Sequence, residues 1–107
     1  MAMTENEFDA LADATLERIV GAIEERAADC ECESKTGGVL EVEFADGSRI
    51  IVNRHSSAQQ IWIAAKSGGH HFRWDGERWV DTRDGLELFS SLSKLVSAQL
   101  GRTVSFI

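Results

Sequence analysis

The sequence predicts an α+β fold, a two-layer sandwich in which an N-terminal and a C-terminal helix pack on one face of an antiparallel sheet of about six strands. Apolar residues recur every three to four positions near both ends of the chain, which is the period of a half-buried helix. Between these segments, short alternating runs are separated by tight turns, which favour antiparallel pairing. The chain has 107 residues, 43% of them hydrophobic, and we expect a single domain over residues 1–107.

The first helix is predicted over the first 27 residues. Its apolar stripe consists of Phe8, Leu11, Ala12, Thr15, Leu16, Ile19, Val20, Ile23 and Ala27. Thr4 followed by Glu7 fits a capping box, in which two side chains satisfy each other's backbone N–H groups. On the opposite side, Asp9, Asp13 and Glu17 form an acidic line facing solvent. Like charges at this spacing repel each other, so the line destabilises the helix slightly.

From residue 29 the period changes to two. Asp29, Glu31 and Glu33 alternate with Cys30 and Cys32, so an extended chain carries the carboxylates on one face and the thiols on the other. We therefore expect the acidic line of the helix to continue onto the first strand. A disulfide between cysteines this close in sequence would be strained, and there is no second cysteine pair for a zinc site. We predict a reduced, structural pair, with a redox or metal role as the alternative.

The remaining strands are predicted at residues 39–44, 49–53, 60–65, 70–74 and 78–80. A second helix is marked by Leu88, Leu92, Leu95, Val96 and Gln99, and the apolar tail at 103–107 is expected to pack against a helix. Ile61 and Ile63 are predicted to face the core, which turns Trp62 outward as an interface residue. A register shift by one residue would bury Trp62 instead, and both alternatives stay open.

The net charge of −7 is concentrated in the first third of the chain. Residues 1–33 carry ten acidic residues against two arginines, a net charge of −8, whereas the rest carries a net +1. This distribution argues against nucleic acid as a partner, because phosphate binding needs a basic face. It favours a cation or a basic protein surface, and the alternative is an acidic face that only keeps the protein soluble.

The apolar runs are far shorter than the roughly 20 residues of a membrane span. The chain starts with acidic residues, whereas a secretory signal starts with basic ones. We therefore expect a cytoplasmic protein without a membrane partner. No G-x-S-x-G, H-E-x-x-H or P-loop motif occurs. His55, His70 and His71 are predicted to be surface histidines, and the protein is not expected to be an enzyme.

Several segments together form a recognisable pattern. They are Gly37-Gly38-Val39-Leu40, Ile50-Ile51-Val52-Asn53-Arg54, Gln60-Ile61-Trp62-Ile63-Ala64, Gly68-Gly69-x-His71-Phe72, Trp79 with Asp84-Gly85, and Thr103-Val104-Ser105-Phe106. Over essentially the whole chain this pattern resembles the bacterial frataxin family, and N-R-x(5)-Q-I-W followed by G-G-x-H-F is its most specific part. The resemblance implies a sandwich of two terminal helices on an antiparallel sheet, in agreement with the periodicity.

The resemblance also implies a role in iron–sulfur cluster assembly, in which the protein regulates assembly or supplies iron and binds Fe2+ or Fe3+ weakly. Its implied partners are the cysteine desulfurase and the iron–sulfur scaffold protein, and its implied state is a monomer that iron can drive into oligomers. The residues that match the family's acidic ridge are Glu24, Glu25, Asp29, Glu31 and Glu33. Asn53, Gln60 and Trp62 match its exposed sheet surface for partner contact. The alternatives are a pure protein–protein adaptor with adventitious iron binding, and a weak ferroxidase activity.

Overall fold

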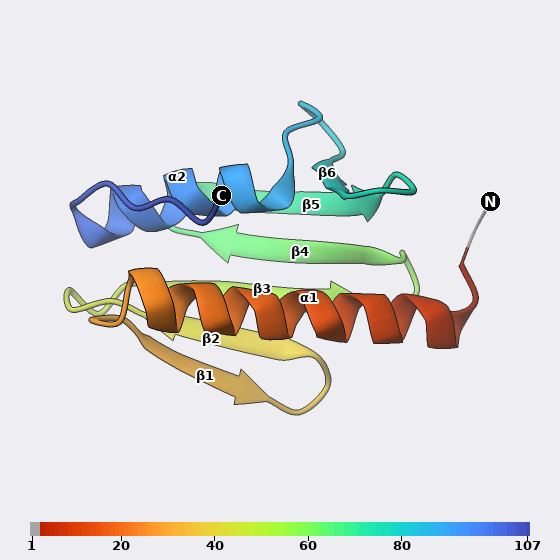
Figure 1. The fold of residues 1–107 in the computed structure, drawn as a ribbon, viewed down its shortest axis with the longest axis horizontal. Helices are drawn as coiled ribbons and strands as arrows, with labels where there is room; N and C mark the ends of the chain where they lie inside the picture. The colour runs from red at the N-terminus through yellow and green to blue at the C-terminus, as the bar shows by residue number, and fades with distance from the viewer. Residues whose placement is uncertain (1–2) are drawn as a thin grey trace.

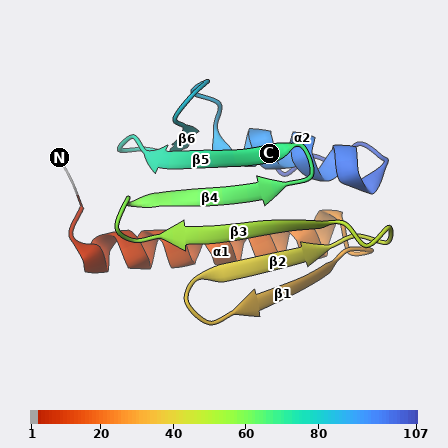
Figure 2. The ribbon, with the colours of Figure 1, turned by 180° about the vertical axis from the view of Figure 1, so that it is seen from behind.

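The computed structural model describes residues 3–107 and has two layers. The elements are α1 (Glu5–Arg26), β1 (Glu31–Lys35), β2 (Val39–Glu43), β3 (Arg49–His55), β4 (Gln60–Ala65), β5 (Gly68–Trp74), β6 (Trp79–Asp81) and α2 (Leu88–Leu100). The six strands form one sheet in the order β1-β2-β3-β4-β5-β6, and every neighbouring pair is antiparallel. Both helices lie on the same side of the sheet (Figure 1), and the other side is open (Figure 2). The predicted fold class is confirmed.

Side-chain caps define where both helices begin. The capping box at the start of α1 is present: Thr4 Oγ1 accepts from the Glu7 N–H at 3.1 Å, and the Thr4 N–H donates to Glu7 Oε1 at 2.9 Å. At the start of α2, the carboxylate of Glu87 accepts from the N–H groups of Phe89 and Ser90. Gly101 ends α2 with a φ of 82°, a conformation that glycine adopts without strain. Neither helix is long and apolar enough to cross a bilayer.

The strand ends differ from the predictions at two places that matter for the site. β1 begins at Glu31 and not at Asp29, because α1 is followed by a turn in which the Cys30 N–H donates to the Ala27 carbonyl at 2.9 Å. β3 extends to His55, two residues beyond its predicted end, because His55 still pairs with Gln60 across the β3–β4 turn. Asp29 therefore lies outside the sheet, and His55 lies within it.

An aromatic group joins α1 to the far edge of the sheet. The rings of Phe8 and Trp79 meet edge to face, with centroids 6.0 Å apart, and both side chains are buried. The indole Nε1–H of Trp79 donates to Thr15 Oγ1 at 2.9 Å, and that hydroxyl donates in turn to the Leu11 carbonyl. The buried polar atoms of this group are therefore paired, so it stabilises the packing of α1 on β6.

The C-terminal tail packs against α2, as predicted. Ser97 Oγ donates to the Val104 carbonyl at 3.1 Å and accepts from the Val104 N–H at 2.9 Å, and the Phe106 N–H donates to Ser93 Oγ. Val104 is buried in the core. Figure 1 shows the tail running back along the helix. The buried Ser93 and the half-buried Ser97 thus hold the tail against α2.

The acidic line of α1 is only partly solvated, which corrects the prediction. Arg54 of β3 forms ion pairs with both Asp9 and Asp13. The arginine side chain lies over Gly38, where an added Cβ would come within 2.5 Å of Arg54 Cγ. Because Gly38 has no side chain, the guanidinium group of Arg54 can extend from the sheet to the carboxylates of α1. Arg54 reduces the repulsion between the two aspartates, so less of the negative charge of α1 is available to a ligand.

Candidate functional site

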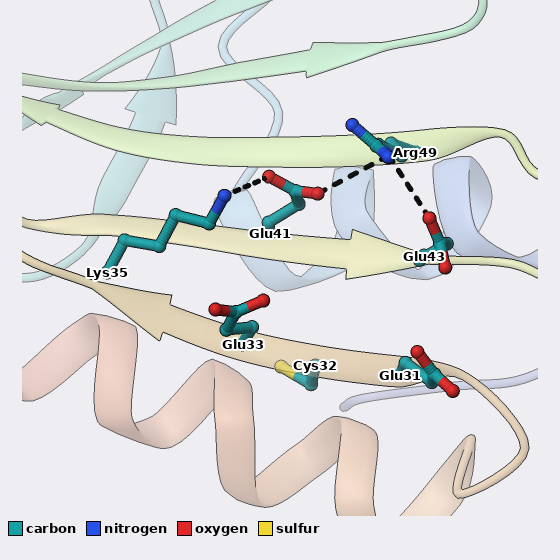
Figure 3. A pocket seen from close by; sticks show the side chains of 7 residues that line it. All are labelled: Glu31, Cys32, Glu33, Lys35, Glu41, Glu43 and Arg49. Carbon is teal, nitrogen blue, oxygen red and sulfur yellow. Dashed lines mark hydrogen bonds and ion pairs between the residues drawn. The ribbon is translucent and has the colours of Figure 1, made fainter.

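The open face of the sheet carries four glutamates at the edge formed by β1 and β2. Their outward orientation follows from the strand register, in which Glu31 pairs with Glu43 and Glu33 pairs with Glu41. Together with Cys32, Lys35 and Arg49 they line an open depression of about 420 Å³ (Figure 3). We call Glu31, Glu33, Glu41 and Glu43 the outer carboxylate cluster. The sheet register brings together residues that are up to 12 positions apart in sequence.

Two basic residues neutralise half of this cluster. Lys35 Nζ lies 2.9 Å from Glu41 Oε2, and Arg49 Nε lies 3.3 Å from Glu41 Oε1 and 3.2 Å from Glu43 Oε2. Figure 3 shows these pairs as one chain across β1, β2 and β3. Among the described residues, no ion pair involves Glu31 or Glu33. These two carboxylates are therefore the ones available to a cation or to a basic partner surface.

We predict that Glu41 stays ionised at lower pH than an ordinary glutamate. The hydrogen bond from Lys35 lowers the pKa of Glu41 from its usual 4.5, and this outweighs the opposing effect of partial burial. Because the pKa is lower in the folded state, the stabilisation by this pair is present above pH 4.5 and is lost as the pH falls through the lowered pKa. A Lys35→Gln variant is expected to return the pKa of Glu41 towards 4.5, measured by NMR titration of the side-chain carboxyl carbon. An unchanged titration in that variant would contradict the prediction.

The five predicted ridge residues lie on both sides of the edge strand β1. Glu31 and Glu33 point away from the helices on the open face, whereas Glu24 and Glu25 belong to the last turns of α1. Asp29 lies in the turn between them and pairs with Arg102 Nη2 at 2.8 Å. The expectation that Asp29 shares a strand face with Glu31 is wrong, because the strand begins two residues later.

The described carboxylates do not form a preformed metal centre. Within residues 3–107, no group of three or more Asp, Glu, His or Cys side chains is arranged to hold a metal ion. A cation at this surface would therefore take only one or two protein ligands and complete its coordination shell with water. Carboxylate oxygens are ligands that hard cations prefer.

Cys30 and Cys32 pack on the core side of the edge strand β1, and Cys32 also borders the depression of the cluster. Both are free thiols; Cys30 is buried in the core, and Cys32 is partly buried and packs against it. They line a small hollow with Glu24 near the end of α1. Burial, reinforced by the negative charge of Glu24, raises the pKa of the Cys32 thiol from 9.0 to about 11. Such a thiol holds its proton at neutral pH, which makes it a poor nucleophile and metal ligand.

We predict that Cys32 reacts about a hundredfold more slowly than a free thiol at pH 8, because a rise of two pKa units lowers the thiolate fraction by that factor. The measurement is the rate of iodoacetamide alkylation in a Cys30→Ser variant, which leaves Cys32 as the single thiol of the chain. The same variant unfolded in urea is the control and should react at the rate of a free thiol. Equal rates in the folded and unfolded states would contradict the prediction.

A second feature of the open face is a stack of three aromatic rings on β3, β4 and β5. Trp62 faces outward while Ile61 and Ile63 are buried. Of the two alternatives that the sequence left open for Trp62, the outward orientation is therefore the one observed. Its indole lies between two imidazoles: the His55 ring at a centroid distance of 3.9 Å and the His71 ring at 4.3 Å, both nearly parallel to it. We call His55, Trp62 and His71 the ring stack.

The other two predicted contact residues lie beside this stack. The Trp62 indole N–H donates to Gln60 Oε1 at 2.7 Å, and Asn53 lies opposite Trp62 in the β3–β4 register. The two histidines of the stack were predicted only as surface histidines, without a functional role. The sequence did contain one signal for His55. A four-residue turn at 56–59 makes His55 the strand partner of Gln60, which puts both residues on the same face as Trp62.

His70 differs from its predicted place on the surface. Its side chain points to the helix side of the sheet and is only 24% exposed, with Nδ1 3.6 Å from Oδ2 of the buried Asp81. Its Nε2 is buried and has no hydrogen-bond partner among the described residues. The prediction failed because neighbouring residues of a strand point to opposite faces, so that of the pair His70 and His71 only His71 faces solvent.

The fold and the site define a class of protein: a two-layer α+β sandwich with an open sheet face that carries carboxylates at one edge and an aromatic stack towards the other. The frataxin-like domain family matches residues 1–102. The chain belongs to the frataxin-like family. The family predicted from sequence is confirmed.

Individual relatives agree with this assignment. The chain is 56% identical over 102 residues to the iron-sulfur cluster assembly protein CyaY of Dechloromonas aromatica, a match that covers 95% of this chain and 97% of that protein. It is similar to the frataxin structure from Psychromonas ingrahamii with a TM-score of 0.89 and 33% identity, over 98% of this chain and 99% of that one. Trimeric frataxin from the yeast Saccharomyces cerevisiae, complexed with ferrous ion, shares the fold with a TM-score of 0.67 and 24% identity, over 95% of this chain and 90% of that one.

Proposed function

We propose that this protein acts in iron–sulfur cluster assembly as a weak iron binder that docks the cysteine desulfurase. The observation that carries the proposal is the outer carboxylate cluster, in which Glu31 and Glu33 have no ion pair among the described residues and lie next to Glu41 and Glu43. The naming of the Dechloromonas relative as an iron-sulfur cluster assembly protein supports the pathway. The desulfurase would contribute a basic surface, and the scaffold protein is the second expected partner. We place the protein in the cytoplasm.

Weak and adaptable iron binding follows from the chemistry of the cluster. Carboxylate oxygens suit Fe2+ and Fe3+ as hard ligands, but an open depression leaves most coordination positions to water. Binding one cation would relieve the repulsion between Glu31 and its partner Glu43 across the strands. Glu24, Glu25 and Asp29 on the other side of β1 would add a second, weaker region, because Asp29 is already paired with Arg102. Iron held between two molecules would favour oligomers of an otherwise monomeric protein.

The iron-binding part of the proposal is tested by titrating the 15N-labelled protein with Fe2+ under argon. Paramagnetic broadening is expected first at the amides of Glu31, Glu33, Glu41 and Glu43, then at Glu24, Glu25 and Asp29. The amides of Glu77 and Asp84, acidic residues outside both regions, serve as internal controls and should stay sharp. Broadening that spreads evenly over all acidic residues would contradict a localised binding surface. On admission of oxygen we expect iron oxidation no faster than in buffer, because a ferroxidase needs a defined site.

The proposed role in cluster assembly is tested with purified desulfurase and scaffold protein. Cluster formation on the scaffold is followed in the presence and in the absence of this protein. A change of rate in either direction supports the proposal and reveals whether the protein activates or inhibits. An unchanged rate over a range of protein concentrations and iron levels would overturn it.

The second candidate function is a pure adaptor that acts by protein contact, with adventitious iron binding. The ring stack favours it, because a half-buried Trp62 held on the open face between two imidazoles is typical of a protein interface. A Trp62→Ala variant discriminates between the two. If partner binding falls at least tenfold while the Fe2+ broadening pattern is unchanged, and cluster assembly fails with it, the adaptor is favoured. If cluster assembly instead survives in Trp62→Ala but fails in a variant that carries Glu31→Gln, Glu33→Gln and Glu43→Gln, the iron-binding function is favoured.

A further inference from the structure

The sheet ends at β1 in an edge that no other segment of the described chain covers. β1 is the first strand of the sheet and pairs only with β2. Within residues 3–107, the backbone of Glu31–Lys35 makes no backbone–backbone hydrogen bond outside the β1–β2 ladder. Figures 1 and 2 show β1 as the outermost strand from both sides. The N–H and C=O groups on its outer side are therefore open to a further strand.

The opposite edge of the sheet, β6, is closed. This strand has only three residues, and Val80 forms an isolated bridge with Glu87. The Asp81 N–H donates to the Leu86 carbonyl at 2.8 Å. The segment that leads into α2 thus occupies the backbone groups of β6. Of the two edges, β1 is the one that offers its backbone to a partner.

β1 lacks the features that usually prevent a further strand from pairing with an edge. It pairs residue for residue with β2, so there is no bulge, and the chain contains no proline. Its lysine, Lys35, reaches back over the sheet to Glu41 at 2.9 Å. The protection that remains is the charge of Glu31 and Glu33. A second copy of β1 would place these carboxylates against their own counterparts, and like charges on neighbouring strands repel each other.

The charges near this edge favour a basic partner. No ion pair among the described residues involves Glu31 and Glu33 on the open face or Glu17 and Glu24 on α1. The basic residues nearby are already paired with carboxylates; they are Lys35, Arg49, Arg54 and Arg102. Unpaired negative charge therefore lies along both sides of β1, and a segment with lysine or arginine residues complements it.

On the helix side, the space between β1 and α1 holds two open hollows of about 370 Å³ each. The first is lined by Val20, Glu24, Ala28, Cys30 and Cys32. The second lies beside Ser34 and includes Leu16 of α1. Ser34 is exposed although it pairs with the buried Leu40, because no strand lies beyond it. The hollows thus offer apolar contact to side chains that enter from the edge.

We propose that β1 accepts an extended segment of a partner protein as a seventh strand, and that basic and apolar residues alternate in this segment. Successive side chains of a strand point to opposite faces. The basic ones would lie beside Glu31 and Glu33, and the apolar ones would enter the hollows beside Cys32 and Ser34. Strand addition obtains affinity from main-chain hydrogen bonds and specificity from alternate side chains. The inference rests on the proposed function in that the same carboxylates take part, and it adds the backbone of the edge strand and the helix-side hollows.

The test uses an acetylated and amidated heptapeptide in which lysine and valine alternate, without iron and without assembly proteins. In 15N NMR spectra the peptide is expected to shift the amides of Glu31–Lys35. At saturation, hydrogen exchange of the β1 amides that point away from β2 should slow at least tenfold. The amides of Trp79–Asp81, on the closed edge, are internal controls and should not change. A peptide of the same composition with all lysines before all valines should bind at least fivefold more weakly.

N-methylated versions of the peptide test the main-chain bonds. Alternate N–H groups of a strand point to its two edges, so methylation at the lysines blocks one edge and methylation at the valines blocks the other. Exactly one of the two versions is expected to lose at least tenfold in affinity. If the two versions bind alike, strand addition is overturned. Docking of a basic surface on the carboxylates, as in the proposed function, would be untouched by that result, because it needs no main-chain bonds.

A matched pair of variants tests the hollows. Ala28 is exposed and lines the first hollow, so Ala28→Arg fills the hollow and repels a basic segment; it should weaken binding at least fivefold. Ala98→Arg makes the same change at an exposed position of α2 and should bind as the wild type does. Equal binding by both variants would overturn the placement of the apolar residues. A protein that is already a dimer without peptide, with protected β1 amides, would overturn the proposal in favour of a second copy at this edge.

Discussion

Replacing Phe8 by alanine is expected to lower the free energy of unfolding by about 3–5 kcal/mol. Phe8 is fully buried, and its ring forms the edge-to-face contact with Trp79 that joins α1 to β6. The substitution would leave a cavity between the two layers and remove the packing that positions the donor of the hydrogen bond to Thr15. For a domain of this size, each kcal/mol corresponds to about 4–8 °C in melting temperature. Urea unfolding followed by circular dichroism measures the loss.

The matched control is Ile107→Ala, which removes a similarly apolar side chain that is 81% exposed. It is expected to change the free energy of unfolding by less than about 0.5 kcal/mol. A loss of less than 1 kcal/mol for Phe8→Ala would mean that the layers repack around the gap. It would then follow that the aromatic group does not set the position of α1.

Neutralising three carboxylates of the outer cluster is expected to weaken both Fe2+ binding and association with the desulfurase at least tenfold. The variant carries Glu31→Gln, Glu33→Gln and Glu43→Gln, and keeps Glu41 with its two ion pairs. The remaining basic residues, Lys35 and Arg49, would then repel a cation or a basic surface. Fe2+ affinity is measured by NMR titration under argon, and the association rate with the desulfurase by biolayer interferometry at two salt concentrations.

A control variant removes the same number of charges elsewhere on the chain. Glu5→Gln, Glu17→Gln and Glu77→Gln lie outside the cluster and likewise reduce the excess of negative charge, from a net charge of −7 to −4. If the control weakens binding as much as the cluster variant does, the overall charge of the protein governs association and the local cluster does not. A cluster variant with unchanged iron and desulfurase binding would remove the basis of the proposed function.

Local periodicity was sufficient to predict the elements but not the residues that the elements bring together. Glu41 and Glu43 already alternated with buried residues in the sequence, yet their place beside Glu31 and Glu33 follows only from the β1–β2 register. A register is a property of two strands, and a change of one residue would turn the entire set to the other face. The five ridge residues carried over from the family resemblance stay a prediction as iron ligands.

The histidines illustrate the same limit. His55, His70 and His71 looked alike as isolated polar residues, but β-sheet geometry separates them. The pleat directs His70 to the helix layer beside Asp81, while the β3–β4 and β4–β5 pairings place the other two rings against Trp62. No pattern within a single strand contains that information, because the contacts join residues of three strands.

The sequence by itself determined the two terminal helices, the alternating strands, the outward side of Trp62 once Ile61 and Ile63 were taken as buried, and the excess of negative charge near the N-terminus. These properties depend on hydrophobic burial at fixed periods, and such periods are local. The tertiary structure alone decided which charges remain free. Arg54 pairs with the helix acids, Arg102 pairs with Asp29, and only Glu31 and Glu33 of the cluster stay without an ion pair among the described residues. Ion pairs between distant segments depend on strand register and on how the layers pack, and no local pattern in the sequence contains either.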